Sequence, residues 1–193
     1  MNRRMFTVGL SAALLLTGVS AFAQSSSWTI DTNHSQVNFQ IRHAGVSTVR
    51  GSISGVAGTV VWDEKDPSKS SVEATMNTTT VSTNNEKRDA HLKSPDFFNV
   101  EKFPTMTFKS TSVSGASGKL QVIGDLTLAG VTKRVTLDVD GPTAPVKGMG
   151  GKMVTGFSAT GTLKRSDFNF GTKFGEPMLG DDVKFTIDVE ADK

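Results

Sequence analysis

The chain has 193 residues, a formal charge of +2, and neither cysteine nor tyrosine. Both surplus positive charges, Arg3 and Arg4, lie in the first 23 residues, which hold no Asp or Glu, so residues 24–193 are formally neutral. Neutrality argues against a nucleic-acid binder, which needs an excess of cations. The missing cysteines exclude disulfides, thiolate metal sites and cysteine nucleophiles.

Residues 1–23 have the pattern of a signal peptide. A positively charged start is followed by an apolar stretch over residues 6–19 and by the small-x-small motif Ala21-Phe22-Ala23. The alternative is an N-terminal anchor helix, although the apolar stretch is short for a membrane span. The arginine pair also partly matches a twin-arginine signal. We therefore expect cleavage near Ala23 and a single periplasmic or secreted domain formed by residues 24–193.

The composition and patterning of residues 24–193 predict an all-β protein. Val, Ile and Thr make up 44 of these 170 residues, which favours strands over helices. Apolar and polar side chains alternate in eight or nine stretches, among them residues 37–43, 72–76, 106–108, 120–128, 135–139, 157–163 and 183–189. One apolar face per strand indicates an antiparallel sheet around a single interior, hence a barrel or a sandwich. The glycines of residues 51–58 predict a strongly bent strand.

One segment breaks the β pattern. Residues 84–93 begin with Asn84 and Asn85, which suit the N-cap of a helix, and continue with good helix formers. Phe97 and Phe98 follow directly after this segment. We expect a short helix whose phenylalanines either cap an open barrel end or fill the core, as in an ordinary helical connection.

Catalytic and metal-binding motifs are weak in this sequence. Residues 51–55, GSISG, place the serine one position away from its place in a nucleophile elbow. The histidines His34, His43 and His91 lack the spacing of a metal site. We expect Asp31 and His34 to tie a turn or strand end by hydrogen bonds, and we expect no metal and no cofactor.

Four polar residues could lie at an opening of the barrel. His43 continues the inward face of residues 37–41. We expect it to be either a hydrogen-bonded histidine at the edge of the core or a polar contact at the mouth of an apolar cavity. Arg88, Asp89 and His91 form either a solvated helix face with weak ion pairs or contacts to a ligand head group.

Several motifs follow one another along the chain: residues 28–39 (WTIDTNHSQVNF), 41–43, 49–51, 88–110 (RDAHLKSPDFFNVEKFPTMTFKS), 124–132 (GDLTLAGVT), 165–168 (RSDF) and 180–183 (GDDV). Together they resemble the YceI-like family, secreted bacterial proteins with a lipocalin-like barrel that binds polyisoprenoid-type lipids. The resemblance covers essentially all of residues 28–190. It departs from the family pattern at Ile53, at Lys133-Arg134 and at Phe170.

The resemblance implies an eight-stranded antiparallel barrel, with a short helix and a loop capping one end, and a prenyl chain or quinone tail inside. An eight-stranded barrel leaves room for side chains or for one slender ligand. We expect the polar residues above to contact the head group, and a homodimer is plausible. The apolar residues expected to bind the ligand are Phe39, Ile41, Phe97, Phe98, Met106, Phe108, Leu126, Leu128, Phe157, Phe168 and Phe185.

Three functions follow from these observations. The first is a periplasmic carrier for an isoprenoid-type lipid, without catalysis. The second is a secreted hydrolase or isomerase of an apolar substrate that uses His91 or His34. The third is a structural stress protein whose barrel interior is filled by its own side chains.

Overall fold

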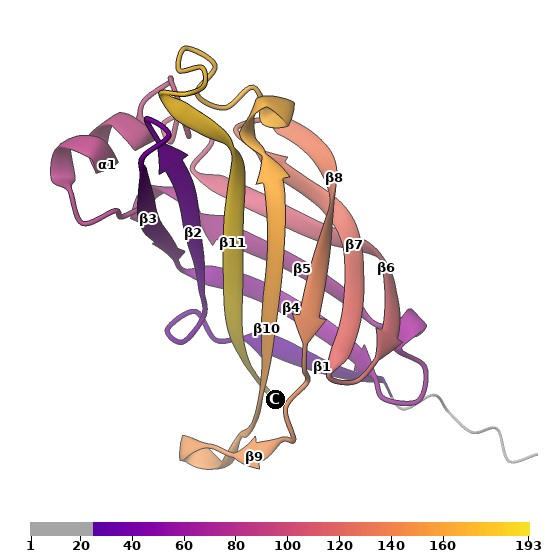
Figure 1. Cartoon of the computed structure of the whole chain (residues 1–193). Helices are drawn as coiled ribbons and strands as arrows, with labels where there is room; N and C mark the ends of the chain where they lie inside the picture. The colour runs from indigo at the N-terminus through magenta and orange to yellow at the C-terminus, as the bar shows by residue number, and fades with distance from the viewer. Residues whose placement is uncertain (1–24) are drawn as a thin grey trace, which may run out of the picture.

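The computed structural model describes residues 25–193 and shows an all-β architecture (Figure 1). The predicted signal peptide lies outside the described residues. The strands are β1 (Ser25–Ile30), β2 (Gln36–His43), β3 (Ser47–Ser54), β4 (Val56–Asp63), β5 (Ser71–Asn77), β6 (Thr105–Ala116), β7 (Lys119–Leu128), β8 (Val131–Asp140), β9 (Val146–Lys147), β10 (Met153–Lys164) and β11 (Leu179–Asp192).

Eight of these strands close into an antiparallel barrel, as predicted. The circuit runs β1-β4-β5-β6-β7-β8-β10-β11 and returns to β1, where Ile30 pairs with Ala191. The remaining long strands, β2 and β3, extend the wall at one end, because β2 pairs with an earlier part of β11. Only Gly55 separates β3 from β4, and its φ of +73° lies in the left-handed region that glycine tolerates best. The glycines of residues 51–58 predicted one strongly bent strand, whereas the structure has two strands that meet at Gly55.

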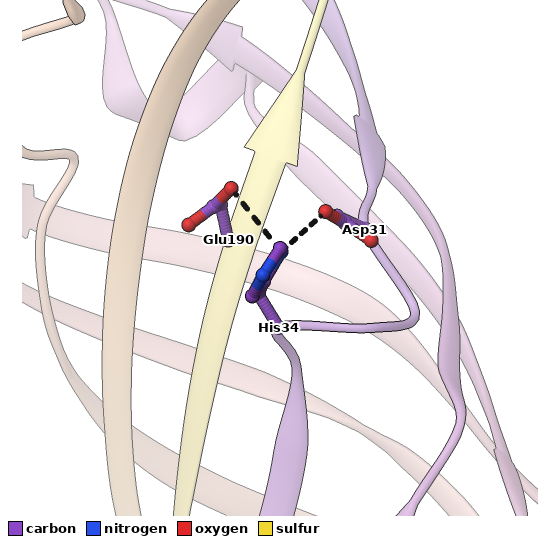
Figure 2. Close-up of side chains that lie close together, drawn as sticks. All are labelled: Asp31, His34 and Glu190. Carbon is purple, nitrogen blue, oxygen red and sulfur yellow. Dashed lines mark hydrogen bonds and ion pairs between the residues drawn. The ribbon is translucent and has the colours of Figure 1, made fainter. Parts of the chain in front are cut away.

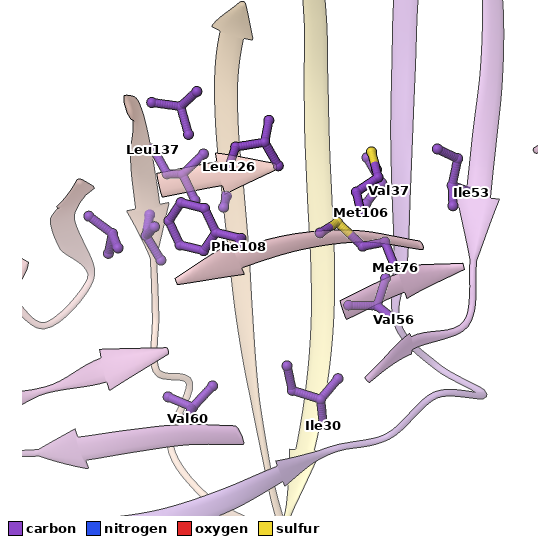
Figure 3. Close-up of a cluster of buried hydrophobic side chains, with 14 of the residues drawn as sticks. Ile30, Val37, Ile53, Val56, Val60, Met76, Met106, Phe108, Leu126 and Leu137 are labelled. Atoms are coloured by element: carbon purple, nitrogen blue, oxygen red, sulfur yellow. The ribbon is translucent and has the colours of Figure 1, made fainter. Parts of the chain in front are cut away.

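The predicted apolar faces point into the barrel and make one core. Figure 3 shows side chains from facing walls meeting there, with Val37 and Ile53 near Met76 and Met106, and Phe108 near Leu126. The outward residues of the same strands are polar and mostly exposed. Period-2 alternation was therefore a reliable guide to which side chains face the interior.

The two barrel ends differ. The only α-helix in residues 25–193, α1 (Glu86–Lys93), lies at one end together with the segment of residues 169–178 (Figure 1). The Asn85 side chain caps α1 by accepting a hydrogen bond from the Arg88 backbone N–H, which confirms the predicted helix start. The short strand β9 lies at the opposite end. In the described part of the chain, no helix has the length and apolar character needed to cross a membrane.

Candidate functional site: an apolar cavity with a polar mouth

An apolar cavity of about 360 Å³ occupies the barrel interior next to α1, and a second cavity of about 130 Å³ continues toward the other end. Both are lined by Met76, Leu126, Phe185 and Ile187, so the two cavities adjoin at these four side chains. The larger volume is within the range of small-molecule sites in proteins. The interior is therefore hollow rather than filled by its own side chains.

Most of the residues predicted to bind a ligand line one of these cavities. Those lining the larger cavity are Phe39, Ile41, His43, Arg88, His91, Phe97, Phe98, Met106, Leu126, Leu128 and Phe185, whereas Phe108 and Phe157 line the smaller one. Two predicted residues line neither cavity. Phe168 is only 2% exposed and is packed into the core, and Asp89 bonds to Thr83.

Sequence reasoning missed several lining residues. Val37, Val183 and Ile187 belong to strands whose alternation was recognised, so the same signal could have identified them. Phe170 and Phe174 also line the larger cavity, but they lie in an irregular segment where no period applies. Arg165 was missed because a charged residue is not expected in an apolar wall.

An aromatic cluster joins α1 to the segment of residues 169–178 over the larger cavity. Phe97 stacks on Phe174 with ring centroids 5.4 Å apart and meets Phe170 edge-on at the same distance. The His91 ring lies edge-on to Phe97 at 5.1 Å and to Phe174 at 5.5 Å. Such aromatic pairs add about 0.5–1.5 kcal/mol each beyond the burial of their area. The helix and this segment therefore form one continuous cover.

Polar contacts reinforce this cover. The Asp96 carboxylate accepts a hydrogen bond from Lys173 Nζ at 2.5 Å and lies 3.2 Å from His91 Nε2. The bond from Lys173, followed by that from His91, holds the pKa of Asp96 below its usual range. Because Lys173 and Asp96 come from different segments, their ion pair links the two halves of the cover.

Arg165 organises the chain that follows β10. This residue is 5% exposed, and all five of its guanidinium N–H groups donate to backbone carbonyls. The acceptors are the carbonyls of Gly180, Phe170, Gly171, Phe174 and Leu179. One side chain therefore fixes the backbone of residues 170–180 against the barrel end.

Arg88 and His43 offer polar groups at the mouth of the larger cavity. Arg88 Nε donates to Thr83 Oγ1 at 2.7 Å, and Nη2 donates to the Thr83 carbonyl at 2.9 Å. Asp89 accepts from the Thr83 N–H at 2.8 Å and from its hydroxyl at 2.5 Å. Within residues 25–193, Arg88 Nη1 and the His43 ring have no hydrogen-bond partner, so both remain available to a ligand.

His34 lies away from both cavities. Its Nδ1 is 2.7 Å from Asp31 Oδ2 and 3.6 Å from Glu190 Oε1 (Figure 2). The hydrogen bond to Asp31 and the charges of Asp31 and Glu190 raise the pKa of His34. These three side chains are near enough to meet one cation. Their contacts, however, are those of a hydrogen bond and an ion pair, which confirms that Asp31 and His34 tie the turn between β1 and β2.

Comparison with known proteins gives consistent matches. The YceI-like domain matches residues 28–191. The protein YceI of Salmonella arizonae is 42% identical over 183 residues, which cover 93% of this chain and 92% of that protein. The crystal structure of the Campylobacter jejuni YceI protein is 35% identical, with a TM-score of 0.69 over 77% of this chain and 86% of that one.

A more distant structure shares the fold. A polyisoprenoid binding domain from Saccharophagus degradans is 13% identical, with a TM-score of 0.64 over 86% of this chain and 97% of that one.

Proposed function

Since the chain belongs to the YceI-like family, we propose that it binds a long-chain isoprenoid-type lipid in the barrel interior. The observation that carries the proposal is the hollow, apolar interior, whose charged lining residues gather at one end. A distant structural relative is described as a polyisoprenoid binding domain, which supports the same ligand class. A prenyl alcohol or a quinone with a prenyl tail has the matching shape, a slender apolar chain with one polar end.

Burial of the chain supplies the affinity. Ten methylenes removed from water contribute about 8 kcal/mol before the ordering costs of binding. The head group would lie near His43 and Arg88, whose free nitrogen atoms can donate hydrogen bonds to a hydroxyl, a carbonyl or a phosphate oxygen. These polar contacts would select among head groups, while the apolar walls hold the chain.

The alternative functions have less support. An enzyme using His34 would need its substrate outside the cavities, because His34 lines neither of them. His91 does line the larger cavity, but it lies against Phe97 and Phe174 and is hydrogen-bonded to Asp96. A filled structural barrel would not contain a cavity of about 360 Å³. We infer a binding protein that acts without catalysis.

The place of action and the assembly are further parts of the proposal. The signal-peptide pattern of residues 1–23 supports export, so the barrel would carry or store its lipid in the periplasm or outside the cell. Detection of the chain beginning near Gln24 in a periplasmic fraction would test export. Light scattering of that purified material would test whether the protein forms a homodimer.

Lipid extraction tests the main proposal. Protein purified from its native host should release an isoprenoid-type lipid on denaturing extraction, identified by mass spectrometry, and the emptied protein should take up an added polyprenol or quinone. Recovery of no lipid together with no uptake would refute the proposal. His91→Ala should keep chain binding, whereas loss of a measurable turnover in that variant would favour an enzyme.

A matched pair of variants localises the binding. Ile41→Glu places a carboxylate on the cavity wall, and Gln40→Glu places the same charge on the neighbouring position of β2, which does not line a cavity. An apolar chain cannot solvate a carboxylate, so Ile41→Glu should weaken uptake at least about tenfold, while Gln40→Glu should leave it unchanged. Equal binding by both variants would place the ligand elsewhere.

A further inference from the structure

Two phenylalanines and two glycines form one row across the barrel wall. In the strand register, Gly51 on β3 lies opposite Phe39 on β2, Phe39 opposite Phe185 on β11, and Phe185 opposite Gly161 on β10. The row therefore reads Gly-Phe-Phe-Gly across four neighbouring strands. Each aromatic residue has a residue without a side chain on its outer flank.

The phenylalanine rings occupy the space that these glycines leave. A Cβ atom on Gly161 would lie 2.9 Å from Cε2 and 3.1 Å from Cε1 of Phe185, and nearer still to Cζ. A Cβ atom on Gly51 would likewise collide with Cζ of Phe39. Each ring therefore lies over its glycine, along the wall, and the two rings extend in opposite directions along the row.

The Phe185 ring lies where the two cavities adjoin, so its position affects the passage from one cavity to the other. Phe185 is one of the four side chains that line both cavities, together with Met76, Leu126 and Ile187. These side chains lie at the junction where the cavity at the mouth adjoins the smaller cavity beyond it. Gly161 is part of the barrel wall, so a Phe185 ring that no longer lies over Gly161 has to move away from the wall. This movement would bring the ring into the junction.

We propose that Gly161 determines the length of chain that the barrel accepts, by letting Phe185 lie against the wall so that the junction between the two cavities stays open. One apolar chain can then run from the mouth through the junction into the smaller cavity. The inference rests on the proposed lipid-binding function for the nature of the ligand. It concerns how deep a ligand penetrates, which can also be measured with simpler apolar probes.

Gly161 is better suited to a test than Gly51. The three atoms nearest to a Cβ at position 161 all belong to the far end of the Phe185 side chain, which can rotate, whereas those nearest to a Cβ at position 51 include the Ser82 backbone carbonyl oxygen at 2.8 Å. Gly156 provides the matched control on the same strand. A Cβ atom there has only ordinary contacts, the nearest at 3.6 Å, and Gly156 lines neither cavity.

Trp62 reports on the smaller cavity. It lines that cavity, and the chain has only one other tryptophan, Trp28, which lines neither cavity. In a Trp28→Phe background, fluorescence then comes from Trp62 alone. Prenyl alcohols of increasing length that carry bromine at the far end of the chain should quench it only when the chain passes the junction. The short probe 1-bromohexane is measured in parallel, because it needs no isoprenoid recognition.

The expected result is specific to one glycine. In Gly161→Ala, quenching of Trp62 by the long probes and by 1-bromohexane should be at least about tenfold weaker than in the parent. The affinity of this variant for the shortest prenyl alcohol should stay within about threefold of the parent's affinity. Gly156→Ala should behave as the parent. Gly161→Ala/Phe185→Leu should regain the quenching, because the obstructing ring is gone.

Each other result has a definite meaning. Undiminished quenching in Gly161→Ala, or no quenching of the parent by any probe, would overturn the inference. If the prenyl alcohols fail to bind but 1-bromohexane shows the same dependence on position 161, the lipid proposal fails while the role of Gly161 stands. If Gly161→Ala does not fold and the double variant does not fold either, the backbone rather than the ring requires glycine, which also overturns the inference.

Discussion

Replacement of Arg165 should weaken the barrel more than replacement of any exposed arginine. Arg165→Met keeps a long apolar stem but removes the five N–H donors, leaving the backbone carbonyls of residues 170–180 without their partner. Each buried carbonyl left without a hydrogen-bond donor costs about 1–3 kcal/mol when water cannot reach it. Because water can reach some of these carbonyls at the barrel end, we expect a total loss of about 3–5 kcal/mol.

Urea unfolding measures this loss. The midpoint should fall while the dependence on urea concentration stays constant, because the surface exposed on unfolding is unchanged. Arg165→Lys keeps the charge but has three donors and no planar fork, so its loss should be smaller, about 1–3 kcal/mol. The control is Arg134→Met on β8, where an exposed pair with Asp125 at 3.4 Å should contribute below about 1 kcal/mol. An Arg165→Met variant within about 1 kcal/mol of the parent would refute the reasoning.

Three further predictions concern charged groups. By NMR titration, the pKa of His34 should lie above 6.5 and should fall toward 6.5 in Asp31→Asn. Because the folded protein favours the charged form of His34, this residue stabilises the fold fully below pH 6.5. The stabilisation is lost as the pH rises through the raised pKa. A midpoint at or below 6.5 in the parent would contradict this. Lys173→Met should raise the lowered pKa of Asp96, detected by titration of its carboxyl carbon, whereas an unchanged value would mean that the ion pair does not form in solution. Asp89→Ala removes two hydrogen bonds and should cost about 1–3 kcal/mol in urea unfolding, and a neutral result would show that they are not needed.

Much of the fold could be predicted from the sequence because one interior imposes one rule on every strand. Period-2 alternation identified Leu126 and Leu128 on β7 and Phe185 on β11 as inward residues, and they do line the larger cavity. The turn between β7 and β8 also has a local basis, because Ala129 and Gly130 both have positive φ, which glycine adopts readily. Such features depend on residues that are close together in the sequence, so they can be predicted from one sequence alone.

The rest depends on contacts between distant segments. Residues 142–151 are rich in Pro and Gly, which is typical of a loop, yet Val146 and Lys147 form β9 against β10. Asp89 was expected near a head group, but its preference for Thr83 follows from how the chain folds back before α1. The burial of Arg165 could not be foreseen, because its partners are backbone carbonyls, which every residue has.

The pairing of β11 has a consequence for how the barrel forms. This strand is hydrogen-bonded to β1, β2 and β10, and its contacts with β1 and β2 join residues near opposite ends of the described chain. Until β11 docks, β1, β2 and β10 present unpaired edges that invite association with other chains. Contacts this distant in sequence form slowly, because the intervening chain must first be ordered. Closure of the barrel by β11 should therefore be a late step in folding. A substitution that weakens this strand should increase aggregation during folding even where it changes the structure of the folded barrel little.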